Sequence, residues 1–406
     1  MRILIAEDER ITRASLARQL QSWGHTVTAA EDGAGAWQLF RSAEFDLVLT
    51  DWEMPGLSGL ELIQHIRAAG ASFVYIIMLT GRSEKADLVK GIEAGADDFL
   101  SKPFDREELR VRLLAGERIV KLERTLNRQN AELREASERM HSDLRAAARV
   151  QRAILPRSDI ETPLVRTAWT YVPSDMLAGD AIGLELLDDR YLAAYVIDVS
   201  GHGVPAALLS VTAMHALGPG GGSAGGGADA IGGASLLRGG AADAHSFAPP
   251  ARVVRELNRR FCASDNDGRF LTMILCVLDT VDGVLRFARA GHPLPVILRA
   301  GKSIPLDDAG GVPIGMVDSA EYDEVSVTLS PGDRLVLLTD GFIEQYDRTG
   351  NELFGLPRVE EALSRHAAAP GHLLVEEMVS ELESWAGTRH FTDDATLVVI
   401  DWTGPQ

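Results

Sequence analysis

The chain has 406 residues, 46% of them hydrophobic, which is enough for two or three domains that each bury a sizeable core. Its formal net charge of −19 argues against a DNA-binding regulator, because a nucleic-acid surface needs clustered cations to displace phosphate counterions. We therefore expect no nucleic-acid partner. The two cysteines, Cys262 and Cys276, lie in apolar sequence and indicate reduced core thiols rather than a disulfide or a zinc site.

The sequence gives no sign of membrane insertion. Arg2 and the charged run Glu7–Arg10 interrupt any apolar opening segment. The longest uncharged stretch starts at Val199, but its helical part is shorter than the roughly 20 residues that a membrane span needs. We expect a cytoplasmic protein with no membrane partner.

The first 105 residues alternate apolar strand patterns with amphipathic helix patterns. The expected strands read ILIAE, TVTAA, DLVLTD, VYIIML and DFLSK, with helical segments such as ITRASLARQLQSW between them. This alternation predicts a doubly wound α/β domain, in which helices cover both faces of a five-stranded parallel sheet. In such sheets functional residues gather at the carboxyl ends of the strands.

Polar residues occupy those strand ends. Glu7 and Asp8 follow the first strand, Asp51 ends the third, Thr80 ends the fourth and Lys102 follows the fifth. Three carboxylates in one crevice repel one another unless a cation lies among them, and oxygen ligands of this kind suit Mg²⁺. A hydroxyl and an ammonium group opposite would hold a phosphoryl group. Each residue alone has an ordinary reading as a turn residue or a solvated charge, but the five together predict a site.

The motifs IAEDE, TDWEMPGLSGLEL, MLTG and DDFLSKPF resemble the receiver domain of bacterial two-component response regulators, over about residues 1–118. The resemblance implies that Asp51 accepts a phosphoryl group from a sensor histidine kinase, and that Glu7 and Asp8 help to hold Mg²⁺. It also implies that Thr80 and Lys102 contact the acyl phosphate and that Phe99 is the switch aromatic residue. Glu7 stands where many members have Asp, which leaves the metal interpretation intact.

A different period follows in residues 119–155. Eleven residues alternate spacings of three and four, as in the a/d seam of a coiled coil: Ile119, Leu122, Leu126, Gln129, Leu133, Ala136, Met140, Asp143, Ala147, Val150 and Ile154. We interpret this segment as a coiled-coil linker, and hence the protein as a homodimer. The alternative is a single amphipathic helix that lies on one of the domains. Gln129 and Asp143 would weaken the seam, which suits a linker whose register changes on phosphorylation.

Residues 156–406 mix short strand patterns with a few helical patterns and predict an α+β domain of antiparallel sheets flanked by helices. The Gly- and Ala-rich segment 218–250 has too few large apolar residues to fold alone, so we expect a flexible surface loop there. Four aspartates lie beside strand patterns, namely Asp180, Asp198, Asp340 and Asp393. Any one of them alone is better read as a turn or capping residue, but together they could surround two divalent ions, Mn²⁺ or Mg²⁺.

The segments VQRAILP, LAGD, IDVSGHGVPAALLS, RVVRELNRRF, FLTMILCVLD, ARAGHPLPVIL, LSPGDRLVLLTDGFIEQ and DDATLVV resemble SpoIIE-like phosphatases of the metal-dependent PPM superfamily. The resemblance implies that Asp198 bridges two Mn²⁺ or Mg²⁺ ions. It assigns the Val199 carbonyl and Asp180 to one ion, and Asp340 and Asp393 to the other.

The chain departs from the family pattern at one place. Many members have a second carboxylate three residues after the first, where this chain has Gly183. This puts substrate or accessory metal contacts in doubt more than catalysis. His202 and His292 are candidate general acids, although each lies in a Gly-rich turn and could only shape it. Ser200 is not expected to be a nucleophile, because VSGHG does not match the GxSxG motif.

The leading hypothesis is a response regulator whose output is a phosphoprotein (Ser/Thr) phosphatase, controlled by phosphorylation of Asp51 through the coiled coil. The resemblance suggests that the substrate is a phosphorylated STAS-type anti-anti-sigma protein in partner switching. The alternative is a non-catalytic module that binds a phosphoprotein or an anti-sigma factor. The complete aspartate set argues against this alternative, since binding alone does not need every metal ligand.

Overall fold

The computed structural model describes residues 1–70, 73–81, 85–218, 235–238, 247–262, 266–304, 306 and 310–405. The chain divides into two compact units, Met1–Arg139 and Met140–Gln406.

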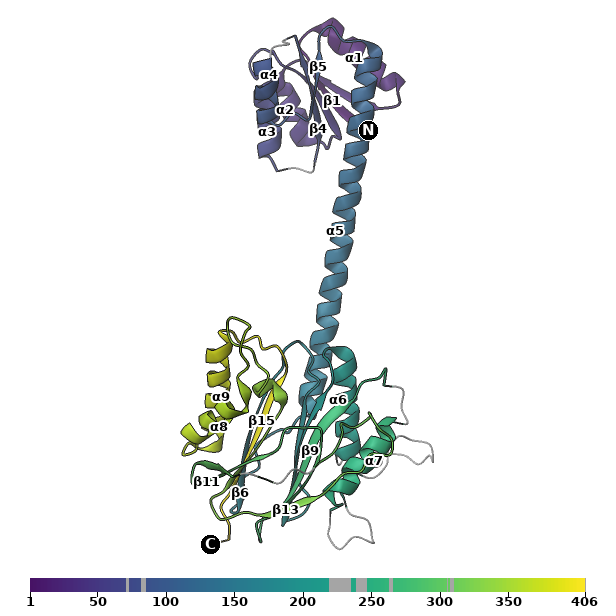
Figure 1. The fold of residues 1–406 in the computed structure, drawn as a ribbon. Coiled ribbons are helices and arrows are strands. Elements are labelled where there is room, and N and C mark those ends of the chain that lie inside the picture. Colours follow the sequence, from purple (N-terminus) through teal and green to yellow (C-terminus); the bar gives the residue numbers. More distant parts are fainter. Residues whose placement is uncertain are drawn as a thin grey trace. The chain divides into compact units, whose positions relative to one another are not determined.

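The N-terminal unit is a five-stranded parallel sheet with strand order β2-β1-β3-β4-β5 (Figure 1). Its strands are β1 (Arg2–Ala6), β2 (Thr26–Ala30), β3 (Leu47–Asp51), β4 (Tyr75–Thr80) and β5 (Asp98–Ser101). Its helices are α1 (Arg10–Ser22), α2 (Gly33–Ser42), α3 (Gly59–Ala68), α4 (Lys85–Ala94) and the first part of α5 (Arg106–Ile154). Every residue of β3 and β4 is buried, as expected for central strands covered by helices on both faces. The predicted doubly wound fold is confirmed.

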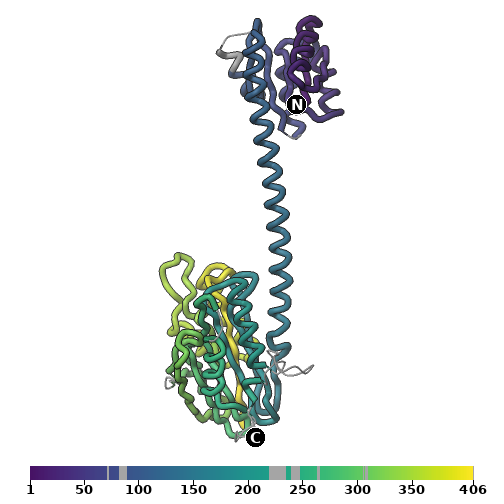
Figure 2. Tube along the Cα trace, turned by 90° about the vertical axis from the view of Figure 1, so that its right-hand side faces the viewer, coloured from purple at the N-terminus to yellow at the C-terminus, as the bar shows by residue number. Residues whose placement is uncertain are grey.

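Helix α5 runs without a break from Arg106 to Ile154, as Figure 2 traces it. It begins 13 residues before the segment predicted from the heptads, because Leu109, Leu113 and Val120 pack into the core of the N-terminal unit. The linker is thus a continuation of the last helix of that unit. Near the other end, Gln151 and Leu155 are buried in the C-terminal unit.

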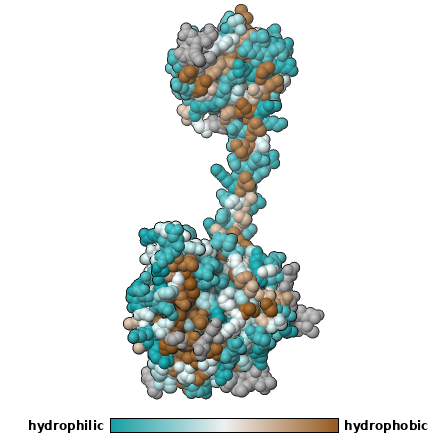
Figure 3. Space-filling model, in the orientation of Figure 1, coloured by the Kyte–Doolittle hydropathy of each residue, from teal (hydrophilic) through white to brown (hydrophobic). Residues whose placement is uncertain are grey.

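The apolar seam residues of α5 remain exposed. The exposed fractions are 62% for Leu122, 52% for Leu126, 67% for Leu133 and 58% for Met140. Figure 3 shows hydrophobic residues along the helix between its hydrophilic ones. The seam is therefore a different face from the one that carries Val120 and Gln151, and docking of the helix ends leaves it uncovered.

The C-terminal unit contains two five-stranded antiparallel sheets, with strand orders β13-β10-β9-β8-β7 and β12-β11-β14-β15-β6. The strands of the first are β7 (Ala181–Leu186), β8 (Tyr191–Val199), β9 (Leu271–Asp279), β10 (Val284–Ala290) and β13 (Val325–Thr328). Those of the second are β6 (Val165–Val172), β11 (Val296–Arg299), β12 (Lys302–Ile304), β14 (Arg334–Leu338) and β15 (Ala395–Trp402). The helices are α6 (Val204–Leu217), α7 (Pro250–Cys262), α8 (Gly355–Arg365) and α9 (Gly371–Ala386), with the short 3₁₀ helix η2 (Asp340–Phe342).

The two sheets stack face to face, and strand β14 shows how. Leu335 and Leu337 belong to the core that also contains β8 and β9, whereas Val336 and Leu338 belong to the core under α8 and α9. Alternate residues of a strand point to opposite faces, so β14 separates two apolar layers. Helices α6 and α7 contact strands of the other sheet. The predicted antiparallel sheets flanked by helices are confirmed.

The segment 218–250, which was expected to be a flexible loop, lies mostly outside the described residues. Two of its described residues, Leu237 and Phe247, are buried in the core of the C-terminal unit. Strands β6, β7, β11 and β12 were not predicted.

In the described part of the chain, no helix is both long and apolar enough to cross a membrane.

Candidate functional site

Glu7, Asp8 and Asp51 converge at the carboxyl ends of β1 and β3 in the N-terminal unit. Each offers a carboxylate oxygen, and the three atoms lie within 4.8 Å of one another. Glu7 is buried and Asp8 is exposed, so the cluster opens to solvent on one side. Gly59 permits the sharp approach of α3, since a Cβ atom there would lie 1.8 Å from the Asp51 carbonyl oxygen. An all-oxygen set of this kind fits Mg²⁺.

Lys102 lies between two of these carboxylates. Its Nζ donates to Asp51 Oδ2 at 2.7 Å and to Glu7 Oε2 at 2.8 Å. Burial alone would lower the pKa of Lys102, but its hydrogen bonds to Asp51 and Glu7 outweigh burial and raise it. Burial raises the pKa of Glu7, against the opposing effect of Lys102. The ammonium group therefore stays charged and balances the acidic cluster.

The other two residues expected at this site are close in the sheet. Thr80 is buried at the end of β4, and its carbonyl accepts the Lys102 N–H at 2.7 Å. Phe99 is half-buried on β5, and a Cβ atom at Gly91 would come within 2.4 Å of its ring. The five polar residues predicted from strand ends thus share one edge of the sheet.

The four aspartates of the C-terminal unit come from separate elements that meet between the sheets. Asp180 lies just before β7, Asp198 lies near the end of β8, Asp340 begins η2 and Asp393 precedes β15. Their charges affect one another. The pKa of Asp180 is raised by burial and then by Asp198, and the pKa of Asp198 is raised to about 8 by burial and then by Asp340 and Asp393.

Nothing among the described residues neutralises these carboxylates by an ion pair with Lys or Arg. Burial and the Asp393 charge also raise the pKa of Asp340 to about 6. Their carboxylate oxygens lie farther apart than those of the N-terminal cluster, since within the described residues only that cluster brings three ligand atoms within 4.8 Å. Carboxylates without a cationic side chain, spread over a site in which Asp180 is buried and Asp198 and Asp340 are half-buried, suit hard divalent ions such as Mn²⁺ or Mg²⁺.

The loop that carries Asp180 is held at three consecutive residues. Gln151 Nε2 donates to the Ala178 carbonyl at 2.6 Å, and its Oε1 accepts the Ala178 N–H at 3.3 Å. Asp394 Oδ2 accepts the Gly179 N–H at 2.7 Å. The hydroxyls of Thr339 and Thr396 donate to Asp180 Oδ2 at 3.0 and 2.6 Å.

These supporting residues, Gln151, Asp394, Thr339 and Thr396, were not found from the sequence. Gln151 is 27 positions from Ala178, and Asp394 is 215 positions from Gly179. No local pattern signals such contacts. The only sequence signal was the neighbouring motifs VQRAILP and FTDDATLVV, which carry Gln151 and Asp394.

Glycines bring the backbone close to the C-terminal site. A Cβ atom at Gly179 would lie 2.9 Å from the Val199 carbonyl oxygen, so only glycine allows this approach. Gly201 and Gly203 have φ angles of 88° and 80°, which favour glycine in the turn after Val199. At Gly183, a Cβ atom would lie 2.1 Å from the Tyr195 ring. Tyr195 therefore fills the space that a second carboxylate would need.

The two histidines differ. His202 is exposed in its turn, and its charge lowers the pKa of Asp393, although burial raises that pKa overall. His292 is only 1% exposed, and burial lowers its pKa to about 3, so it is neutral at physiological pH. A residue this enclosed cannot reach a leaving group, so His292 does not fit a general acid. Ser200 accepts the Phe270 N–H at its hydroxyl, which is a structural contact.

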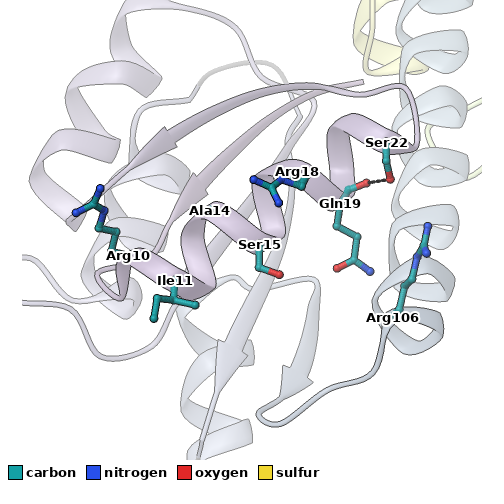
Figure 4. Close-up of a pocket in the computed structure, with 8 residues that line it drawn as sticks. All are labelled: Arg10, Ile11, Ala14, Ser15, Arg18, Gln19, Ser22 and Arg106. Atoms are coloured by element: carbon teal, nitrogen blue, oxygen red, sulfur yellow. Dashed lines mark hydrogen bonds between the residues drawn. The ribbon is translucent and has the colours of Figure 1, made fainter.

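A hollow of about 1180 Å³ lies elsewhere, in the N-terminal unit (Figure 4). It is lined by Arg10, Ile11, Ala14, Ser15, Arg18, Gln19 and Ser22 of α1 and by Arg106 of α5. None of these is a predicted site residue. The carboxylate sites are shaped by charge rather than by an apolar cavity.

Residues 3–114 match the family model of the response regulator receiver domain, and residues 220–403 match that of stage II sporulation protein E (SpoIIE). The chain joins a receiver domain to a SpoIIE-family phosphatase domain. The SpoIIE match begins after Asp180 and Asp198, so the involvement of these two residues rests on the geometry above.

Known proteins resemble each part. The two-component response regulator PhoP of Pseudomonas aeruginosa is 44% identical over 117 residues, which are 28% of this chain and 51% of PhoP. The response regulator MprA of Mycobacterium ulcerans is 42% identical over 123 residues, 30% of this chain and 53% of MprA. The chain thus spans about half the length of the curated relatives it matches.

Among solved structures, the SiaA-PP2C domain of Pseudomonas aeruginosa is similar over 66% of this chain and 98% of its own, with 24% identity and a TM-score of 0.53. This likeness shows that the SpoIIE-family domain has the PP2C fold. The Vibrio cholerae chemotaxis protein CheY4 is 30% identical over 28% of this chain and 96% of its own, with a TM-score of 0.27.

Proposed function

We propose that the protein is a response regulator whose SpoIIE-family domain hydrolyses phosphoserine or phosphothreonine in a protein, with two Mn²⁺ or Mg²⁺ ions. The observation that carries this proposal is a group of carboxylates with raised pKa values and no Lys or Arg ion pair among the described residues, of which Asp180 is buried and Asp198 and Asp340 are half-buried. Such a group is costly unless cations bind there, so it favours a metal site over a merely structural one.

The chain's own residues hold the ligands in place. Asp198 would contribute to both ion sites, Asp180 and the Val199 carbonyl to one of them, and Asp340 and Asp393 to the other. Bound divalent ions supply a water of lowered pKa and neutralise charge on the phosphoryl oxygens. Thr339 and Thr396 fix the Asp180 carboxylate, so its orientation does not have to be acquired during metal binding.

In the receiver domain, Asp51 would accept the phosphoryl group from a sensor histidine kinase, with Mg²⁺ held by Glu7, Asp8 and Asp51. The contact of Lys102 with Asp51 supports this role, because an ammonium group at that oxygen would equally bind a phosphoryl oxygen. Thr80 and Phe99 would sense the acyl phosphate.

Control of the phosphatase domain would pass through α5. Gln151 of this helix bonds both backbone groups of Ala178, two residues before Asp180, so a shift of the helix would move a metal ligand. The exposed seam at Leu122, Leu126 and Leu133 would pair with a second copy as a parallel coiled coil. The substrate we propose from the family resemblance is a phosphorylated STAS-type anti-anti-sigma protein.

Hydrolysis of p-nitrophenyl phosphate by the full-length protein with Mn²⁺ tests the proposal. We expect turnover that EDTA removes and that Asp198→Asn abolishes, whereas Asp51→Asn, altered only in the receiver, retains turnover. Turnover that does not depend on metal would overturn the proposal. Absence of turnover in the wild type, even when its receiver carries a phosphoryl mimic, would also overturn it. In the second case, binding of a phosphorylated STAS-type protein without its dephosphorylation would identify a non-catalytic binding module.

A further inference from the structure

A partly buried hydrogen-bond chain leads from Asp198 into the core. Thr272, on the neighbouring strand β9, is directly opposite Asp198 in the register of β8 and β9. Its Oγ1 lies 3.4 Å from Asp198 Oδ2 and 2.8 Å from His292 Nδ1. The carboxylate expected to contact both metal ions is thus connected through one hydroxyl to a fully buried imidazole.

The imidazole has a fixed position. His292 follows Gly291, whose φ of 66° and tight contact with Pro313 favour glycine at this turn. Arg289 donates to the His292 carbonyl at 2.9 Å and closes the turn after β10. The turn fixes the backbone of His292, and its buried ring lies with Nδ1 toward Thr272.

The tautomer of the ring determines what Thr272 can do. His292 Nε2 is buried and makes no hydrogen bond of good geometry among the described residues, and the Leu338 carbonyl only partly offsets the lowering of the ring's pKa by burial. A buried N–H without a well-placed acceptor is costly, whereas Nδ1 lies 2.8 Å from Thr272 Oγ1, so we place the proton of the neutral ring on Nδ1. Nδ1–H then donates to Thr272, and the Thr272 hydroxyl hydrogen is left to donate to Asp198.

We propose that His292 is a positioning residue that acts through Thr272 to orient the Asp198 carboxylate for binding of the divalent ions. The inference rests on the proposed function and names a role that the general-acid hypothesis for His292 missed. Carboxylate ligands that receive such a hydrogen bond are held in one rotamer, which favours metal binding. His292 does not touch the substrate or the ions in this role.

Two measurements on the full-length protein test the proposal. Nitrogen-15 spectra of the metal-free protein, assigned with His292→Phe, report which ring nitrogen carries the proton, and we expect Nδ1. Electron paramagnetic resonance of free Mn²⁺ gives the metal affinity. We expect Thr272→Val to weaken Mn²⁺ binding by about tenfold, the lower range for lost supporting contacts, and Thr272→Ser to restore it.

Thr280→Val is the matched control. Thr280 is buried just beyond the other end of β9 and its hydroxyl donates to the Arg190 carbonyl, so this variant should bind Mn²⁺ like the wild type. If His292→Phe folds, the double variant with Thr272→Val should bind no more weakly than Thr272→Val alone, because the two residues act in series.

Wild-type Mn²⁺ affinity in Thr272→Val, or a proton on Nε2 of His292, would overturn the inference whether or not the enzyme turns over. Absence of turnover in the wild type, with the expected tautomer and the expected loss of Mn²⁺ affinity, would instead reject only the proposed phosphatase activity.

Discussion

At the scale of residues, two neighbouring aspartates have different roles. Asp393 is exposed, and among the described residues its side chain accepts a hydrogen bond only from the Asp394 N–H, so its carboxylate is available to a metal. Asp394 is 4% exposed and accepts from the N–H and hydroxyl of Ser174 and from the N–H of Gly179. The first residue can serve as a ligand, while the second holds the loop that carries another ligand.

Substitution of each aspartate should separate these roles. Asp394→Asn places an amide N–H₂ where oxygens accept backbone donors, and should lower the free energy of unfolding of the metal-free protein by about 1–3 kcal/mol. Asp393→Asn should weaken Mn²⁺ binding without destabilising the metal-free protein, because it removes one of several repelling charges. Urea unfolding with EDTA, beside Mn²⁺ titration, measures both. Equal loss of stability in the two variants would contradict this division of roles.

The raised pKa values predict a pH dependence for the metal-free protein. The pKa values of Asp198 and Asp340 are raised from 3.8 to about 8 and about 6, so between about pH 4 and 8 the folded state binds more protons than the unfolded state. The free energy of unfolding should therefore fall as pH rises through this window. Thermal unfolding in EDTA at pH 6 and pH 8 should show a lower midpoint at pH 8. Asp198→Asn should reduce the difference, and a pH-independent midpoint would contradict the prediction.

At the scale of elements, the sequence predicted what local patterns encode. Strands such as β3 and β8 are long apolar runs, and the candidate ligands at their ends, Asp51 and Asp198, could be found from the sequence pattern. Strands β6 and β7 were missed because their apolar and polar residues alternate weakly around Tyr171 in β6 and Gly183 in β7. Pairing with the distant strand β15 stabilises β6, and a hairpin with β8 stabilises β7. Contacts such as those of Gln151 depend on tertiary structure and leave no local pattern.

Helix α5 offers a test of one such contact. Gln151→Leu keeps an apolar body of similar size but leaves the Ala178 N–H and C=O unpaired, which costs about 1–3 kcal/mol locally. We expect faster hydrogen exchange at Ala178 and Gly179 and weaker Mn²⁺ binding. Asn127→Leu, which changes an exposed amide of the same helix off the seam, is the matched control and should change neither. Unchanged exchange in Gln151→Leu would show that the loop is held by Asp394 and the threonines alone.

At the scale of the whole molecule, the chain passes from one unit to the other within α5. The exposed seam predicts that two copies pair along this helix. Leu126→Glu with Leu133→Glu would bury four carboxylates in a parallel dimer, so sedimentation should show a monomer. Asn127→Glu with Ala131→Glu adds the same charge off the seam and should remain dimeric. A dimer in both variants would place the dimer contact elsewhere than the seam.

The heptad spacing also predicts how the signal travels along α5. At about 100° per residue, deletion of residues 127–133 removes seven residues and rotates one end of the helix against the other by only about 20°, whereas deletion of residues 130–133 rotates it by about 40° and interrupts the seam. The readout is the change in p-nitrophenyl phosphate turnover that a beryllofluoride mimic at Asp51 causes. If α5 transmits a rotation or register change, the seven-residue deletion should preserve this change. The four-residue deletion should abolish or invert it. Circular dichroism and sedimentation confirm that both variants remain helical and show their oligomeric state. An identical response in the two deletions would mean that α5 acts as a tether, because a tether is insensitive to the phase of its ends.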